Sequence, residues 1–402
     1  MFRASLFLAA LTLAAPTVAQ DVVVPPLATT GRACNGSNGY AADFDGARTF
    51  LWRPRWVEAI VADPSMRDDI IEGGDAALAN GPYSVTDKPR PVPGATANDY
   101  ASIGPYWWPS GRGDGLPYTR RDGEVNPERD GPEFDRDRLR NFAADMKALA
   151  LAWHATREDR YAERAASLAR TWFLDPATRM NPNMDFAQGI PGRVDGRGEG
   201  IIEARDLSTV AESLGLLWAS GALSTDDKRD LMQWYGEMAV WLATSENGAD
   251  EMAKTNNHGV FYDFTLAHFA LFAGADDVLR NIVRNFPQYR LGVQMDRQGR
   301  FLDELRRTRS WHYAHFVVEG AAQLATIAEC VDLDLWNAQL DDGRSLATAR
   351  DFLRRYEADP ETWPFPDTDL ARVRFDTMRE RAARIRALTG ESEDATSLSN
   401  LL

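Results

Sequence analysis

Cysteine is scarce in this chain of 402 residues, which contains only Cys34 and Cys330. Two cysteines are too few for a disulfide-rich scaffold or a zinc site built from thiolates. An exported protein often joins such a pair, but sequence does not show that the two residues meet in space, so the disulfide stays open. Of the five histidines, His312 and His315 lie three apart with no acidic third ligand in evident reach. A metalloenzyme using them with His258 is therefore the weaker alternative, and we expect no metal and no cofactor.

Long hydrophobic segments are also missing. The apolar run Ser5–Ala15 is too short to span a bilayer, follows the positive Arg3, and precedes the small residues Thr17–Ala19. This pattern is typical of a secretory signal peptide over residues 1–19, cleaved near Ala19, with an N-terminal membrane anchor as the alternative. We expect a periplasmic or secreted mature chain without a membrane span.

Positive charge is in short supply overall, since the formal net charge is -15. This balance argues against nucleic acid as a partner. It does not exclude an anionic substrate, because a local basic groove outweighs the mean field at short range. The hydrophobic fraction of 44% is sufficient for a large core.

Strand-like alternation is weak, with one candidate hairpin at Tyr289–Leu302 around the turn Asp296–Gly299. Apolar residues at spacings of three and four instead predict a chain of helices. The predicted helices cover Trp52–Ala62, Met66–Leu78, Leu139–Ala155, Arg160–Phe173, Ile201–Ala219, Thr225–Thr244, Asn256–Phe272, Asp276–Phe286, Trp311–Cys330, Ser345–Tyr356 and Asp369–Leu388.

The helices predict an all-α fold, an (α/α)n toroid or incomplete α/α barrel with a central cleft, with a plain helical bundle as the alternative. Two long loops, at residues 79–134 and 175–200, are rich in glycine and proline, and the first of them carries many aromatic residues. Loops of this length in a compact enzyme are commonly functional. We expect an irregular N-terminal arm over residues 20–50, one domain over 51–388, and a frayed polar tail over 389–402.

The first chemical motif is Asn256-Asn257-His258, which opens a predicted helix with Thr255 as its expected cap. A neutral imidazole accepts a proton, and the amide of Asn257 offers a donor beside it. The alternative is structural, with Asn256 as the cap and His258 as an ordinary surface histidine.

The second motif is Glu304–Phe316, a basic, aromatic segment in an acidic protein. Arg307 and Arg309 are suited to bidentate binding of carboxylates. Arg309 and Tyr313 lie four apart, on one face of a helix, where positive charge would favour the phenolate. A solvated arginine face beside a half-buried tyrosine is the alternative.

Histidine, tyrosine, asparagine and arginine together suit β-elimination at a uronate. The C5 proton lies next to a carboxylate and is very weakly acidic, so neutralising the carboxylate stabilises the charge that develops. A base then removes the proton, and an acid protonates the leaving O4.

The two motifs resemble those of the alginate lyase superfamily of α/α-toroid polysaccharide lyases. Asn256-Asn-His258 is similar to its Asn-His motif, and Glu304-Leu-x-Arg-Thr-Arg-Ser-Trp-x-Tyr313 to its Arg/Tyr motif. Further segments resemble the branch that includes enzymes acting on glucuronate polymers: Ser102–Trp108, Arg121–Asn126, Met180–Asn183, Gln188–Pro191 and Gly198–Glu203.

The resemblance implies a role for each matching residue. Asn257 and His258 fall on the carboxylate-neutralising and base positions, and Tyr313 on the position that protonates O4. In a syn elimination the tyrosine serves as both base and acid. Arg307 or Arg309 falls on the substrate-carboxylate position, and the doubled arginines leave that choice open.

The loops suit an anionic polysaccharide substrate. Tyr106, Trp107 and Trp108 are placed to stack on sugar rings, although tryptophans equally often fill a core. The remaining candidate substrate-binding residues are Arg120, Arg121, Asn183, Gln188, Glu203, Asn256 and His312.

Two other functions compete with the lyase hypothesis. A glycoside hydrolase needs two opposed carboxylates, for which Glu203, Asp263 and Glu304 are candidates. A non-catalytic periplasmic sugar-binding protein needs only the tryptophans and arginines. The sequence predicts neither the uronate that is cut nor the oligomeric state.

Overall fold

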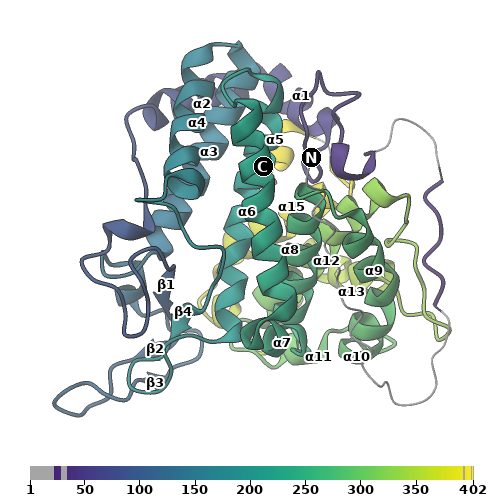
Figure 1. The fold of residues 1–402 in the computed structure, drawn as a ribbon. Coiled ribbons are helices and arrows are strands. Elements are labelled where there is room, and N and C mark those ends of the chain that lie inside the picture. The colour runs from purple at the N-terminus through teal and green to yellow at the C-terminus, as the bar shows by residue number, and fades with distance from the viewer. Residues whose placement is uncertain (1–21, 29–33, 393, 400, 402) are drawn as a thin grey trace.

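The computed structural model describes residues 22–28, 34–392, 394–399 and 401 of the chain (Figure 1). The signal peptide expected at residues 1–19 lies outside these ranges. Helices dominate the described part, and none of the helices within it is long and apolar enough to cross a membrane.

Four inner helices pack one against the next in chain order: α3 (Arg136–Thr156), α5 (Arg205–Leu216), α8 (Asn257–Phe272) and α12 (Ser310–Ala328). In α8 and α12, apolar residues lie on every face of the helix, which is typical of helices surrounded by other elements. His258 is the one residue of α8 that is not buried, and on α12 the exceptions are His312 and Gln323.

Outer helices cover this inner layer. Helices α2 and α4 pack on α3, α6 and α9 pack on α8, and α13 and α15 pack on α12. The two layers form an incomplete α/α toroid, so the predicted fold class is confirmed. The helices outside the inner layer are α1 (Pro54–Ala62), α2 (Pro64–Ala77), α4 (Asp159–Ala169), α6 (Thr225–Thr244), α7 (Glu246–Met252), α9 (Asp276–Phe286), α10 (Gly292–Gln294), α11 (Leu302–Leu305), α13 (Leu346–Glu357), α14 (Thr368–Ala371), α15 (Phe375–Leu388) and α16 (Ala395–Ser399).

Short 3-10 and π segments extend or connect several of these helices. The 3-10 segments are η1 (Gly36–Asn38), η2 (Val85–Asp87), η3 (Pro127–Asp130), η5 (Gly198–Ala204), η6 (Leu217–Ala219), η8 (Glu329–Val331) and η9 (Pro360–Thr362), and the π segments are η4 (Arg170–Leu174) and η7 (Pro287–Leu291). Helix α6 begins as the sequence predicts, with a capping box between Ser224 and Asp227.

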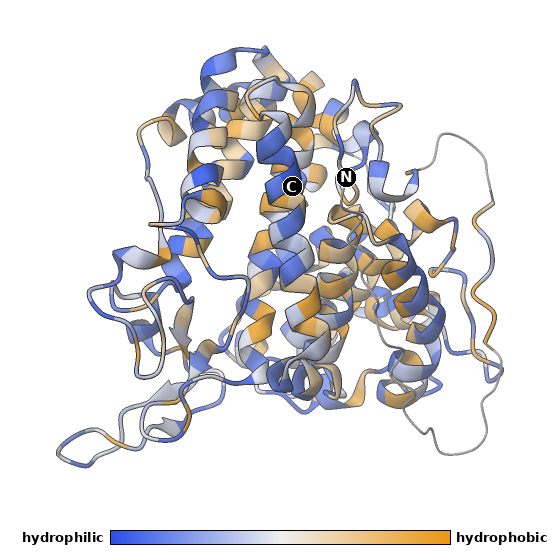
Figure 2. Ribbon diagram, in the orientation of Figure 1, coloured by the Kyte–Doolittle hydropathy of each residue, from blue (hydrophilic) through white to orange (hydrophobic). Residues whose placement is uncertain are grey.

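Residues 79–134 and 175–200, which we call the loop layer, lie beside one end of the helices and are mainly hydrophilic (Figures 1 and 2). Strand β1 (Ala101–Ile103) pairs in parallel with β4 (Phe186–Gly189), which joins the two loops. Strand β2 (Trp107–Trp108) pairs antiparallel with β3 (Thr119–Arg120) at the base of a projecting arm. These strands of two to four residues are too short to show a period in the sequence.

The hairpin predicted at Tyr289–Leu302 is wrong in its extent, although its turn at Asp296–Gly299 is confirmed by the Gly299 N–H, which donates to the Asp296 carbonyl. The segment forms η7 and α10, and only a single bridge joins Met295 to Phe301. Leu291 and Gln294 are buried three residues apart, so the segment has a helical period that the turn residues obscured.

Both ends of the described chain are held to the helices. Cys34 and Cys330 form a disulfide, which settles the question that the sequence left open. The N-terminal arm is irregular as expected, but Tyr40 and Phe44 are buried in the core. In the predicted frayed tail, α16 packs on α1 and Leu398 is 1% exposed, because an apolar side chain there completes the contact.

Candidate active site

A cleft of about 1270 Å³ lies between the loop layer and the inner helices. Eleven arginine and lysine side chains line it against five aspartates and glutamates, in a chain whose net charge is -15. The local excess of positive charge makes the cleft a site for a polyanion. Tyr106, Asn257, His258, Arg307 and Tyr313 all line it, so the two sequence motifs face the same space.

Tyr313 lies in the first turn of α12 and receives contacts from both sides. Its hydroxyl is 2.6 Å from the hydroxyl of Tyr106 in the loop layer, and Arg307 Nη2 donates to it at 2.9 Å. The Arg307 guanidinium also lies 3.8 Å from the centre of the Tyr313 ring and donates to Asp122 at 3.1 Å. Asp122 thus orients Arg307, which in turn donates to the hydroxyl of Tyr313.

Burial, with the help of Tyr106, raises the pKa of Tyr313, while Arg307 acts in the opposite direction. We expected positive charge to favour the phenolate. The structure corrects this expectation, because loss of solvent outweighs the guanidinium. In the free protein Tyr313 is therefore a neutral phenol, able to donate a proton.

His258 occupies the second position of α8, with its ring at the cleft. Its backbone N–H donates to Asn256 Oδ1 at 3.0 Å, so the helix cap is Asn256 and not Thr255 as predicted. Asparagine is the stronger N-cap of the two. Nδ1 of the His258 ring lies 2.6 Å from Oε1 of Glu251, whose side chain is fully buried. The other ring nitrogen, Nε2, is therefore the one available to the cleft.

Glu251 was missed by sequence reasoning. It lies near the end of α7, whose sequence Glu-Asn-Gly-Ala-Asp-Glu-Met has no apolar period and reads as a loop. Burial raises the pKa of Glu251, and the adjacent His258 opposes the increase. The only available signal was an acidic residue seven positions before a candidate histidine.

Asn257 is buried at the wall of the cleft and contacts Glu304. Its backbone N–H and its side-chain Nδ2 both donate to this carboxylate, the side chain at 3.0 Å to each oxygen. The two carboxylate oxygens of Glu304 lie on the same side of Asn257 Nδ2. One N–H bond of this amide is therefore shared between the two oxygens, and its second N–H bond points elsewhere. Burial raises the pKa of Glu304, and the Asn257 donors oppose that change.

Of the two candidate arginines, Arg307 reaches the Tyr313 hydroxyl, whereas the side chain of Arg309 turns to Asp369 at 2.9 Å. Arg309 still lines the cleft. His312 also lines it, stacked on Phe316 and receiving a 2.9 Å hydrogen bond from Arg381 at Nδ1.

The remaining histidine of the motif is outside the cleft. His315 is fully buried between Trp311 and Glu357.

The ring of His312, by contrast, lines the cleft. Burial and the nearby cation of Arg381 lower the pKa of His312 to about 2, so the His312 ring is neutral.

The predicted substrate-binding residues of the loops divide into two groups. Trp107, Arg120 and Gln188 line the cleft, and so does Asn256, the N-cap of α8. Trp108 and Arg121 pair with each other 5.0 Å apart, outside the cleft lining.

Asn183 and Glu203 serve the packing of the loop layer. Asn183 donates to Asp99. Glu203 reaches the cleft but is 3% exposed and accepts hydrogen bonds from Tyr100 and Ser102.

The hydrolase candidates do not form an opposed pair of free carboxylates. Asp263 is bound by Arg290 at 2.7 and 2.8 Å, Glu304 by Asn257, and Glu203 by the loop layer. Within the described ranges, no cluster of three or more His, Cys, Asp or Glu side chains is arranged to hold a metal ion.

Fold and cleft together define an α/α toroid with a cationic cleft. Residues 84–363 match the alginate lyase family, and the chain belongs to this family of polysaccharide lyases. The crystal structure of an alginate lyase from Bacteroides ovatus is similar over 88% of this chain and 95% of that chain, with 30% identity and a TM-score of 0.81.

Two structures of alginate lyase A1-III are less similar. Alginate lyase A1-III from Sphingomonas species A1 is 19% identical over 86% of this chain and 93% of that one, with a TM-score of 0.49. A variant of alginate lyase A1-III complexed with a tetrasaccharide is 17% identical over 84% and 92%, with a TM-score of 0.50. No curated protein matches the chain significantly.

Proposed function

We propose that the protein cleaves a 1,4-linked uronate polymer, either alginate rich in mannuronate or β-1,4-glucuronan, by β-elimination. The observation that carries the proposal is the hydroxyl of Tyr313, bonded to Arg307 in the same cationic cleft that His258 lines. The alginate lyases among its structural relatives support the substrate class.

The reaction breaks the C5–H and C4–O4 bonds and forms the C4–C5 π bond and a new O4–H bond. A base takes the C5 proton, the electron pair left on C5 forms the C4–C5 double bond, and the C4–O4 bond breaks. An acid protonates O4, which leaves as the hydroxyl of the departing chain. The new end is a 4,5-unsaturated uronate, and no water is consumed.

Asn257 and His258 form the part of the cleft that we assign to the carboxylate of the sugar. The N–H of Asn257 that is directed away from Glu304 is the donor we assign to it. Arg307 adds positive charge beside Tyr313, where negative charge develops as the proton moves. Asp122 and Glu304 fix these two groups before the substrate arrives.

Two assignments of base and acid fit the cleft. In the first, His258 is the base through Nε2, oriented by Glu251, and Tyr313 is the acid, as its raised pKa favours. In the second, Tyr313 performs both steps on one face of the sugar, as a syn elimination of mannuronate or glucuronate requires. The two proposed substrates undergo syn elimination and therefore favour the second assignment, whereas cleavage of polyguluronate, the C5 epimer, would favour the first.

The test is incubation of the purified protein with polymannuronate, polyguluronate and β-1,4-glucuronan. A lyase produces an unsaturated uronate that absorbs in the near ultraviolet, a hydrolase produces reducing ends without absorbance, and a binding protein produces neither. Tyr313→Phe should reduce the lyase rate by about 10²–10⁴-fold, the usual contribution of general acid–base catalysis. A Tyr313→Phe protein that kept most of its activity would remove this residue from the mechanism.

We also propose that the mature protein is periplasmic or secreted. The Cys34–Cys330 disulfide supports this location, because disulfides persist in oxidising compartments. Detection of the mature protein in a periplasmic or culture-medium fraction, with a new N-terminus near Gln20, is the expected result.

A further inference from the structure

Arg197 lies in the loop layer, directly before η5, and its side chain lines the cleft. Its neighbour Gly198 packs against α7, since a Cβ atom on Gly198 would lie 3.0 Å from the backbone nitrogen of Glu251. Glu251 is the carboxylate that contacts the ring of His258. Arg197 is therefore placed on the His258 side of the cleft.

The side chain of Arg197 is held by Gln188. Nε donates to the Gln188 carbonyl and Nη2 donates to Gln188 Oε1, both at 2.9 Å. Gln188 is itself 5% exposed, and it donates from its backbone N–H to Ser102 Oγ and from Nε2 to Glu203 Oε1. One edge of the planar guanidinium is thus fixed by buried groups of the protein itself.

The backbone of Gln188 is strained where it makes these contacts. Its φ of 47° lies in the left-handed region, which residues other than glycine seldom adopt. A glycine at this position would relieve the strain, but it would supply neither Oε1 for Arg197 nor Nε2 for Glu203. Strained residues that are fixed by their surroundings concentrate at functional sites. The conformation of Gln188 therefore indicates that the position of Arg197 serves more than packing.

Arg197 keeps hydrogen-bond donors for a ligand. A guanidinium has five N–H bonds, of which Gln188 accepts two. Nη1 also lies 3.3 Å from Glu199 Oε2, and the other oxygen of this carboxylate lies 3.2 Å from Lys254 Nζ. Among the described residues, these contacts leave one N–H on each terminal nitrogen of Arg197, whose side chain is 21% exposed.

The charges around Arg197 favour a further anion. Burial lowers the pKa of Arg197, and the nearby Arg120 adds to the decrease. Glu199, Glu251 and Glu203 act in the opposite direction without offsetting the loss of solvent. A carboxylate that accepts from the two remaining N–H bonds would therefore stabilise this guanidinium, and an uncharged sugar would do so less well.

We propose that Arg197 binds a carboxylate of the uronate chain on the His258 side of the cleft. The inference rests on the proposed lyase function and adds a substrate-binding residue to it. Arg307 donates to Tyr313 from the segment before α12, whereas Arg197 is held by the loop layer. The two guanidiniums thus occupy different places in the cleft and hold the chain at two points.

The test is calorimetry with oligomers of mannuronate and of glucuronate, in a Tyr313→Phe background that slows cleavage. Adding Arg197→Met should lower the affinity about tenfold, the loss typical of one charge-assisted contact. Because salt screens an ion pair with the ligand, the difference between the two proteins should shrink as ionic strength rises. A merely structural role of Arg197 would lower the affinity equally at every salt concentration.

The matched control is Arg197→Met/Glu199→Gln, which keeps the net charge of the cleft and removes the carboxylate that faces Arg197. If Arg197 contacts the ligand, this double variant should keep most of the tenfold loss. Full recovery of the affinity would show that only the mean charge of the cleft matters, and would overturn the proposal.

If circular dichroism shows that Arg197→Met does not fold, Glu199→Gln takes its place. It releases Nη1 of Arg197 and should raise the affinity more than Asp250→Asn, which removes the other carboxylate of Lys254. An equal change in the two variants would contradict the proposal.

The outcomes separate this proposal from the proposed function. If the wild-type protein cleaves no uronate polymer, the lyase proposal fails, while the calorimetry still decides whether Arg197 binds a uronate. If the Tyr313→Phe protein binds neither oligomer, or if the loss in Arg197→Met is independent of salt, Arg197 is excluded as a carboxylate ligand even where cleavage is observed.

Discussion

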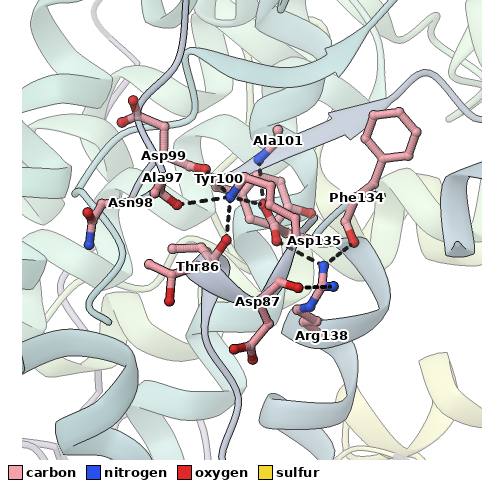
Figure 3. Close-up of polar contacts among 12 residues, drawn as sticks. Thr86, Asp87, Ala97, Asn98, Asp99, Tyr100, Ala101, Phe134, Asp135 and Arg138 are labelled. Carbon is pink, nitrogen blue, oxygen red and sulfur yellow. Dashed lines mark hydrogen bonds and ion pairs between the residues drawn. The ribbon is translucent and has the colours of Figure 1, made fainter. Parts of the chain in front are cut away.

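The inner helices α8 and α12 bury mainly apolar side chains, whereas the loop layer is joined to the start of α3 by a buried charged pair. Lys88 Nζ and Asp135 Oδ2 are 2.9 Å apart, with 1% and 0% of their side chains exposed. Lys88 also donates to the backbone carbonyls of Val85, Ala97 and Asp99. Figure 3 shows Asp135 between the N–H of Ala101 and the side chain of Arg138.

Apolar packing and the Lys88–Asp135 pair contribute differently to the structure. Burial raises the pKa of Asp135 and lowers that of Lys88, so for both groups the loss of solvent outweighs the attraction between them. The pair therefore adds little net stability. It fixes the path of an irregular chain, because each carbonyl it binds has a defined place, and that path brings Tyr106 to Tyr313.

The largest effect on this comparison is expected from Lys88→Met. The substitution removes the nearer of the two cations of Asp135 and leaves Arg138 at 3.2 Å, so we expect a cost at the lower end of the about 3–5 kcal/mol range for a broken buried pair. Urea unfolding should show this loss, and activity should fall while the helical circular dichroism at low denaturant persists. The double variant Lys88→Met/Asp135→Leu should recover much of the stability. Equal loss in the single and double variants would contradict the role of the pair.

The same comparison explains what could be predicted from the sequence. Helix α6 was predicted with the same bounds as those observed, because its apolar period and its cap at Ser224 are local signals. The two motifs were placed in one cleft by residue type and by family resemblance. The contacts of Lys88, Asp122 and Glu251 were not predicted, because their partners are distant in the chain or lie on short polar segments. Long-range polar contacts have no period in sequence.

A third region, the irregular N-terminal arm, is attached to the helices by the disulfide, and removing this bond tests its contribution. It joins residues 296 positions apart, so in the chain-entropy view it restricts a very long loop of the unfolded state. Cys330→Ser should lower the free energy of unfolding by about 2–4 kcal/mol. Wild-type protein unfolded with a reducing agent should match the variant. Tyr40 and Phe44 remain buried, so we expect activity at low temperature to persist.

Glu251→Gln weakens the helix side of the site alone. Its carboxylate acts through His258 as a positioning residue, so kcat should fall while KM changes little. Carboxylates that orient metal-bound imidazoles typically contribute 10–100-fold, and we expect a loss of about that size. The matched control is Glu237→Gln on α6, an exposed carboxylate that contacts Gln233. A loss of the same size in both variants would show that the effect is one of net charge.

Tyr106→Phe changes the loop side by one oxygen atom and should have the smallest effect. The ring keeps its packing, and the Tyr313 hydroxyl loses a partner at 2.6 Å but keeps Arg307. A single neutral hydrogen bond contributes about 1 kcal/mol, so we expect kcat to change by less than about tenfold.

The sign of the accompanying pH shift reports the chemistry of Tyr313. Tyr106 raises the pKa of Tyr313, so removal of its hydroxyl should lower that pKa. If Tyr313 donates the proton to O4, the fall of kcat at alkaline pH begins at lower pH in Tyr106→Phe than in the wild type. If Tyr313 is itself the base, the rise of kcat with pH moves to lower pH instead. An unchanged pH profile would show that the loop layer positions the substrate without tuning the phenol.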